Sequence, residues 1–336
     1  MREEKQLTFK LQNAPIIVGL SAFTANSTVK LNWPSEINYA ELELNKKLLA
    51  DVKEKLEWVK RQYQVLLKNP KTSAFAPHVA PYLTQANLHI SADGNAFASE
   101  VAVLGGYPLE YTINLAKSLS SAVGSHVKPV QVTKVKESGK PAIEDRSRFR
   151  IIKIEPINEL EAGFESYYGS SGLSYAAAYE SWLDLSYEDK QKQLVSAISS
   201  RQAGVSYLME VILEPQLLMD GKISGFFDIR AIQPPSPVHG YSLPKNLADG
   251  GMTEKCFDIS YELYSELSTK YSSAAPLVCL WGHRQRALVG VNLSGLKCMA
   301  SAKIGRLRRL AQVLLDKLAE KHPLIIEEVR ATVNKL

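Results

Sequence analysis

The chain has 336 residues, of which 45% are hydrophobic and 22% are charged, and these proportions are typical of folded globular proteins rather than disordered ones. No apolar run reaches the roughly 18 residues that a membrane-spanning helix needs, and no apolar signal core is present, so we expect no membrane association. The three cysteines, Cys256, Cys279 and Cys298, are scattered, which argues against disulfides and favours the reducing cytoplasm. The six histidines are not at metal-ligand spacing, so no metal site is expected.

The N-terminal part is predicted to mix strands and helices. Strands are expected at 15–23, from a continuous apolar run, and at 27–33, from period-two alternation. Apolar residues spaced by three and four between Leu44 and Leu66 predict a long amphipathic helix that Asn69 and Pro70 end. A hairpin is expected between strands 82–90 and 95–104, followed by a helix from Pro108 to Val123 and a strand at 129–135.

The following segment, 134–147, is charged and contains Gly and Pro, so it is the best candidate for a linker. We therefore predict an α/β protein of the α+β type with two domains, a mixed α/β domain at 1–140 and a second domain at 148–336. The N-terminal sheet is expected to pack against the long helix that ends near Lys68.

In the second domain, the period of the apolar residues predicts these elements in order. Strands are expected at 149–157 and 211–219, and short and long helices at 187–200, 222–231, 253–270, 305–321 and after Pro323. Ser186 and Asp189 form a variant of the capping box at the start of the first of these helices. The Tyr-rich segment 163–181 could pack in a core or stack on a ring-shaped ligand.

The charge is unevenly distributed. The net charge is only +5, but no Asp or Glu occurs from Leu267 to Leu315, although the chain has 35 acidic residues. A surface without carboxylates lets positive potential accumulate and attracts phosphate. The alternative is a solvated helix face whose long basic side chains cover apolar surface.

The order of features from Phe149 to the C-terminus resembles the flavin-dependent thymidylate synthases. KISGFFDIRA stands where that family has a short helix leading into its Arg-His-Arg signature, MTEKCFDISYELYSELSTKY resembles its long helix, and HRQRALVGVN resembles the strand that ends in an asparagine. The resemblance implies the fold of that family for the C-terminal half, and a homo-oligomer, a tetramer, with sites between subunits. It also implies FAD as the cofactor.

The resemblance assigns residues one by one. Asn292 matches the asparagine that contacts FAD, while Arg230, Ser236 and Glu210 are what this sequence keeps of the other flavin- and nucleotide-binding positions. The segment RAIQPPSP replaces the Arg-His-Arg signature, and Val211 stands where the family has a histidine. No catalytic residue is assigned. The basic residues of the acid-free segment are expected to bind phosphate; they are Arg284, Arg286, Lys303, Arg306 and Arg309.

Two functions from different classes follow. The first is a flavoenzyme of the thymidylate synthase type, a methyltransferase or reductase acting on a pyrimidine nucleotide with FAD. The alternative is a catalytically degenerate homologue that binds a nucleotide or nucleic acid or serves as an assembly subunit, since a fold does not fix a function. Self-association is expected through helix 253–270, because it carries more apolar surface than one neighbour need cover. Its apolar stripe consists of Ile259, Leu263 and Leu267, with Phe257, Tyr261 and Tyr264 beside it.

Overall fold

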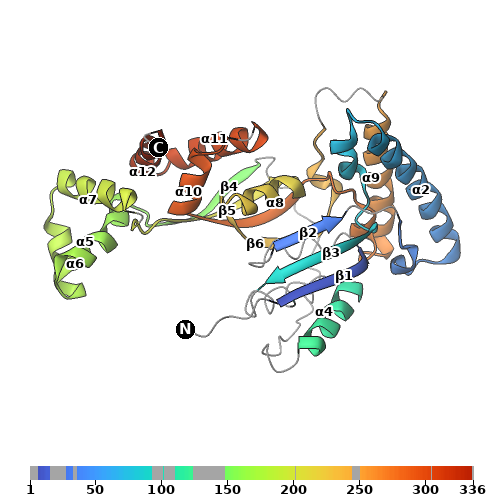
Figure 1. The fold of residues 1–336 in the computed structure, drawn as a ribbon, viewed down its shortest axis with the longest axis horizontal. Coiled ribbons are helices and arrows are strands. Elements are labelled where there is room, and N and C mark those ends of the chain that lie inside the picture. Colours follow the sequence, from blue (N-terminus) through green and yellow to red (C-terminus); the bar gives the residue numbers. More distant parts are fainter. Residues whose placement is uncertain are drawn as a thin grey trace. The chain divides into compact units, whose positions relative to one another are not determined.

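The structure is a computed structural model with mixed helix and sheet, so the α+β class expected from the sequence is confirmed (Figure 1). None of the described helices is long and apolar enough to cross a membrane. The residues described are 7–15, 28–32, 36–92, 101, 110–123, 148–200, 202–243, 250–303 and 305–334.

The chain divides into two compact units, and each is made of more than one segment. The first unit contains Met1–Arg146, Ile212–Pro215 and Ala231–Arg286, and the second contains Ser147–Val211, Gln216–Arg230 and Ala287–Leu336. One boundary, between Arg146 and Ser147, lies close to the division expected at residue 140. The segment 231–286 nevertheless groups with N-terminal residues, which the linear order of the sequence did not indicate.

The first unit contains a three-stranded sheet of order β1-β3-β2. Its strands are β1 (Leu7–Pro15), β2 (Thr28–Asn32) and β3 (Gln85–Ala92). Both outer strands pair antiparallel with β3. The strands expected at 27–33 and 82–90 are therefore confirmed, whereas most of the one expected at 15–23 lies outside the described residues.

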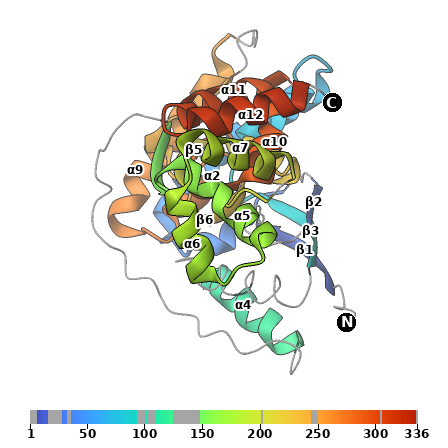
Figure 2. The same cartoon turned by 90° about the vertical axis from the view of Figure 1, so that its left-hand side faces the viewer.

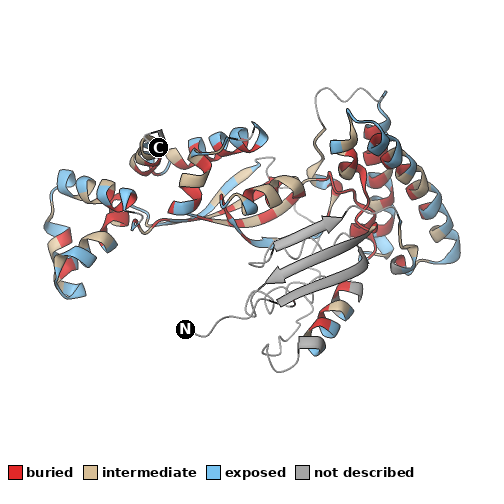
Figure 3. Ribbon diagram, in the orientation of Figure 1, coloured by how far each residue is buried: buried red, intermediate tan, exposed pale blue. Residues whose placement is uncertain are grey.

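Helices α2 (Lys46–Lys68) and α9 (Met252–Lys270) pack on each other in this unit (Figure 3). The side chain of Asn45 caps α2 by accepting a hydrogen bond from the amide of Leu48 at 3.0 Å. The contacts of α2 are chiefly with the 3-10 helix Ser73–Val79 and with α9, rather than with the sheet that we expected it to cover. The predicted helix, its apolar face and its end before Pro70 are confirmed.

Most of the apolar stripe of α9 is covered within the chain. Phe257 is 1% exposed, Leu263 and Leu267 are fully buried and Ile259 is partly buried, whereas Tyr261 is 54% exposed. The covered residues leave little free surface for the contact predicted on this helix, and self-association itself stays a prediction. Helix α4 (Glu110–Val123) agrees with the prediction, but Val101 is helical where a strand was expected. The rest of that strand, the strand expected at 129–135 and most of the linker lie outside the described residues.

The second unit is organised around a four-stranded antiparallel sheet of order β4-β5-β7-β6. Its strands are β4 (Phe149–Glu155), β5 (Ser206–Leu213), β6 (Asp228–Ile232) and β7 (Gln285–Asn292). Buried and partly exposed residues alternate along β5 and β7, so one side of the sheet forms a core and the other is partly open.

Two predicted elements between β5 and β7 are wrong. The strand expected at 211–219 ends at Leu213, and Pro215 begins the helix α8 (Pro215–Ile223), because proline fits the first turn of a helix. The helix expected at 222–231 is instead the turn after α8 followed by the strand β6. Gly225 provides this turn, with a φ of 70° that favours glycine.

The remaining helices of the second unit form two groups (Figure 1), which touch through α7 and α12. The first group has α5 (Phe164–Ser171), α6 (Tyr175–Asp184) and α7 (Tyr187–Ser199). The second has α10 (Leu293–Ala300), α11 (Gly305–Ala319) and α12 (Pro323–Asn334), which pack on one another. The predicted helices at 187–200, 305–321 and after Pro323 are confirmed, as is the Ser186 cap, whose hydroxyl accepts from the Asp189 amide at 3.1 Å.

Candidate functional site: a basic groove in the second unit

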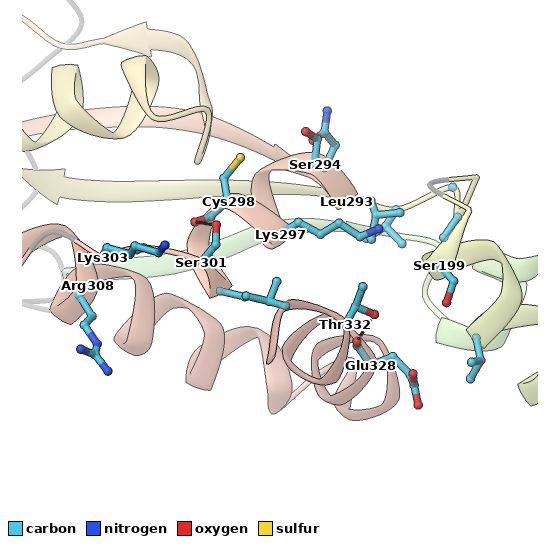
Figure 4. Close-up of a pocket in the computed structure, with 18 residues that line it drawn as sticks. Ser199, Leu293, Ser294, Lys297, Cys298, Ser301, Lys303, Arg308, Glu328 and Thr332 are labelled. Atoms are coloured by element: carbon cyan, nitrogen blue, oxygen red, sulfur yellow. Dashed lines mark hydrogen bonds between the residues drawn. The ribbon is translucent and has the colours of Figure 1, made fainter. Parts of the chain in front are cut away.

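An open groove of about 1350 Å³ runs along α10 in the second unit. One side comes from α10 and the turn after it, and the others come from α11, α12 and the end of α7 with the segment Ala203–Val205 (Figure 4). Its size exceeds the few hundred to about 1000 Å³ of pockets for drug-sized molecules, which suits an extended ligand.

Lys303 and Arg308 lie at one end of this groove (Figure 4). Both side chains are exposed, and neither forms an ion pair with any residue that the structure describes. Arg308 follows Leu307, which is 3% exposed and anchors this turn of α11 in the core. With Leu307 in the core, Arg308 lies on a flank of α11 that lines the groove, and its charge is available to a ligand.

The third cation of the groove, Lys297, has a structural role. Its Nζ donates to the carbonyl oxygen of Ile198 at 2.6 Å, in the last turn of α7. A lysine at this position adds a donor to a carbonyl of the last turn and lies near the negative end of the helix dipole. This contact holds α10 and α7 at a fixed spacing and so shapes the groove.

The start of α10 adds polar groups to the groove. Asn292 caps this helix, and its side-chain oxygen accepts from the amide of Gly295 at 3.0 Å. The amide group of the Asn292 side chain keeps its hydrogen-bond donors. Leu293 and Ser294 also line the groove, and the first amides of a helix favour anions. Among the residues that the resemblance assigns to FAD binding, Asn292 therefore lines the groove.

The opposite end of the groove carries hydroxyl groups and one acid. Ser199 lies there, and Glu328 and Thr332 of α12 face it (Figure 4). The Thr332 hydroxyl donates to the carbonyl oxygen of Glu328 at 2.8 Å. The groove therefore mixes polar and apolar lining, and its two exposed cations lie at one end, which would fix the direction of an elongated ligand with terminal phosphates.

Two other predicted residues, Arg230 and Glu210, lie on the partly open side of the sheet and do not line the groove. Arg230 forms an ion pair with Asp228 at 2.9 Å, and its guanidinium group crosses β7 over Gly290. Asp228 and Arg230 lie two apart on a strand and so share a face, whereas the predicted helix would have separated them. Glu210 is opposite Arg150 of β4.

Three predicted residues belong to the first unit. Arg284 holds a loop in place, because its Nε donates to the Ser242 hydroxyl at 3.0 Å and its Nη1 donates to the carbonyl oxygen of His239 at 3.4 Å. Ser236 begins the short 3-10 helix Pro237–His239. Arg286 is half-buried near the start of β7 and is the last residue of its segment of the first unit. Arg284 and Ser236 thus support the local structure of the first unit. The other predicted cations, Lys303, Arg306 and Arg309, belong to the second unit.

Arg306 and Arg309 lie on a different side of α11 from Arg308, because successive residues are rotated by about 100°. Arg306 pairs with Asp220 of α8 at 2.8 Å. An acid 86 residues away along the chain thus neutralises part of the acid-free segment. Arg309 is exposed and has no ion pair among the described residues.

Each of the two units contains buried titratable groups. In the second unit the Tyr207 hydroxyl and Nδ1 of His322 lie 2.6 Å apart. Burial lowers the pKa of His322 and raises that of Tyr207. In the first unit, burial lowers the pKa of His283 to about 4, and its Nδ1 accepts a hydrogen bond from the amide of Leu280 at 3.0 Å.

Three groove residues, Lys297, Ser294 and Thr332, were not assigned to the site from the sequence. Lys297 and Arg308 belong to the acid-free segment, but neither was among the basic residues expected to bind phosphate. Helical periodicity places Arg308 beside the buried Leu307 side of α11, yet it cannot show which flank of the helix faces a groove. No protein-family model and no curated protein matches this chain.

Proposed function

We propose that the second unit binds a nucleotide ligand in the groove along α10, with the ligand's phosphates at the end formed by Lys303 and Arg308. The observation that carries this proposal is that both cations line the groove without an ion pair among the described residues. A guanidinium group binds phosphate oxygens through two parallel hydrogen bonds, and a lysine adds a compact charge beside it.

The neutral part of the groove supports a ligand that is longer than its phosphates. The donors of Asn292 and the hydroxyls of Ser294, Ser301 and Ser199 line the remaining length, and such groups can bind sugar and base edges. This role is one of binding and agrees with the non-enzymatic alternative, a nucleotide- or nucleic-acid-binding protein.

FAD is a second candidate ligand, because Asn292 matches the flavin-contacting asparagine in the resemblance to flavin-dependent thymidylate synthases. The fit is partial. Arg230 and Glu210 lie on the sheet, and Ser236 lies in the first unit, so only Asn292 of the four residues lines the groove. When bound, FAD supplies hydride-transfer chemistry, and here Asn292 would only orient it.

The test is equilibrium titration of the full chain with a short single-stranded oligonucleotide, dUMP and FAD. We expect the ligand that binds wild-type protein to bind the Lys303→Glu/Arg308→Glu variant up to about 1000-fold more weakly, because two attractions of roughly 1 kcal/mol each become repulsions of similar size, a change of about 4 kcal/mol. Fluorescence anisotropy of a labelled oligonucleotide and the flavin absorbance of FAD distinguish the ligands.

The control variant is Lys46→Glu/Lys47→Glu, in the exposed first turn of α2, which makes the same change in net charge in the first unit. It is expected to keep wild-type affinity. If no ligand binds the wild-type protein, or if both variants lose affinity equally, the groove is not the site and the proposal is wrong.

A further inference from the structure

The chain contains an acidic segment that complements its basic one. Between Ile154 and Asp189 there are eight acidic residues and no Lys or Arg. They are Glu155, Glu159, Glu161, Glu165, Glu180, Asp184, Glu188 and Asp189. This segment forms α5, α6 and the start of α7, whereas the segment without acids includes the start of α11. One unit of one chain therefore presents two helical surfaces of opposite charge.

Helix α6 carries an exposed apolar stripe beside its acids. Tyr175, Tyr179 and Leu183 are 63%, 40% and 53% exposed and recur every fourth residue. Glu180 and Asp184, one position further along, are also exposed. Apolar surface of this kind on a helix, bordered by charges of one sign, is typical of an interaction surface.

The tyrosines of this stripe are held in fixed positions. The rings of Tyr175 and Tyr179 are parallel within 3°, with centroids 6.4 Å apart. Each packs edge-on against the buried Phe164, at 5.5 Å and 5.4 Å. Because Phe164 in turn packs against Trp182 in a small core, the rings are already ordered, which reduces the entropy lost on binding a partner.

Helix α11 carries a stripe of the same spacing and opposite charge. Arg309, Val313 and Lys317 also recur every fourth residue, all three are exposed, and Val313 is 45% exposed. Neither cation forms an ion pair with a described residue. Arginine binds the faces of tyrosine rings as well as carboxylates, so this stripe suits the one on α6 in both charge and spacing.

We propose that α6 of one molecule docks on α11 of a second copy of this chain, with Tyr175, Tyr179, Glu180 and Asp184 facing Arg309, Val313 and Lys317. The two helices lie apart within the unit in both views (Figures 1 and 2), so the contact joins different surfaces of the two molecules. A head-to-tail contact of this kind builds a ring if the rotation closes and an open chain if it does not. Lys190 is the first basic residue after the acidic segment, and its Nζ donates a hydrogen bond to the carbonyl oxygen of Leu183 at 3.0 Å.

This contact leaves the nucleotide groove accessible, because Arg308 and Arg309 lie on different flanks of α11 and Arg309 does not line the groove. The proposal does not rest on the proposed function, and the two fail separately. Replacement of Arg309 is expected to change assembly without changing ligand affinity, and replacement of Arg308 is expected to do the reverse.

The experiment is sedimentation velocity on the full chain at micromolar concentration with two charge-reversed variants, Glu180→Lys/Asp184→Lys on α6 and Arg309→Glu/Lys317→Glu on α11. Wild-type protein is expected to self-associate, and to do so less at high salt because exposed charges are screened. Each variant alone is expected to associate about tenfold or more weakly. All replaced residues are exposed, and circular dichroism checks that each variant is folded.

Mixing the two variants gives the decisive result. In the mixture, the intact α6 of one variant can dock on the intact α11 of the other. The reversed α6, now basic, likewise meets the reversed α11, now acidic, so both contacts are again complementary. We therefore expect the mixture to recover self-association that neither variant shows alone. A monomeric wild-type protein, a variant that assembles like wild type, or a mixture that stays monomeric would overturn the proposal.

Discussion

Helices α9 and α6 carry similar stripes of apolar and aromatic side chains, but the chain covers one and exposes the other. Phe257 and Leu263 of α9 are 1% and 0% exposed because α2 and neighbouring segments pack on them. Tyr175 of α6 is 63% exposed, and it is the adjoining flank of α6, with Ala178 and Trp182, that is buried. An amphipathic stripe therefore indicates an interface, and only the fold shows whether the partner is the same chain.

The largest expected effect tests the covered stripe. Leu263→Ala is predicted to lower the free energy of unfolding by about 2–5 kcal/mol, because it leaves a cavity under α2 and α9. Tyr261→Ala, on the exposed side of the same helix at 54% exposure, is predicted to change it by less than about 0.5 kcal/mol. Urea denaturation measures both. Equal effects would show that the stripe is not a core.

A pH dependence tests the same core through His283, whose ring packs edge-on against Phe257 at a centroid distance of 5.0 Å. Burial lowers its pKa from 6.5 to about 4. Below pH 6.5 the unfolded chain therefore binds a proton that the folded chain does not, and stability decreases as the pH falls. The loss due to this residue is predicted to reach about 3 kcal/mol near pH 4.

His283→Asn isolates this contribution, since the asparagine oxygen can accept the Leu280 amide but does not titrate. Urea denaturation between pH 7 and pH 4 should show a smaller loss of stability in the variant than in the wild-type protein. Parallel curves for the two proteins would contradict a buried, neutral His283.

A glycine pair compares tight and open packing within the second unit. A Cβ at Gly295 in α10 would overlap the carbonyl oxygen of Phe226, whereas a Cβ at Gly305 in α11 would meet no atom within 4 Å. Gly295→Ala is predicted to destabilise the protein by about 1–3 kcal/mol. Gly305→Ala is predicted to stabilise it by up to about 1 kcal/mol, as alanine does in an open helix. Thermal unfolding of both variants decides the signs.

The smallest expected effect tests the exposed stripe. Tyr175→Ser is predicted to lower the free energy of unfolding by only about 0.5–1 kcal/mol, because its ring is 63% exposed and loses little more than its edge-on contact with Phe164. Trp182→Ala, on the buried side of α6, is predicted to cost about 3–5 kcal/mol. Denaturation curves compare the two. A large loss for Tyr175→Ser would mean that this tyrosine belongs to the core.

The elements with strong local determinants could be predicted from the sequence. Helix α2 has a long apolar period, an asparagine cap and a proline after its end, and α7 begins at the Ser186 cap. Strand β6 could not, because its five residues follow the apolar pair Phe226 and Phe227 and too few positions remain to distinguish a period of two from one of 3.6.

The candidate site was predicted only in part, because the prediction used the distribution of charge along the sequence and not its distribution in space. The acid-free segment drew attention to Lys303 and to Asn292, which do line the groove. Its other members depend on contacts distant in sequence, such as Arg306 with Asp220, 86 residues away. Arg284 donates to the loop of Ser242, 42 residues away. Such contacts arise from tertiary packing and leave no local pattern.

The most direct test of the nucleotide groove uses two adjacent arginines of α11. Arg308 lines the groove and Arg309 does not, although both are exposed. The measurement is the salt dependence of the binding constant of a short single strand for Arg308→Gln, Arg309→Gln and wild-type protein. Arg308→Gln is predicted to reduce the slope of log K against log salt by about 0.7, the value for one lost phosphate contact, and Arg309→Gln to leave it unchanged. Equal slopes for the two variants would contradict a phosphate site in the groove.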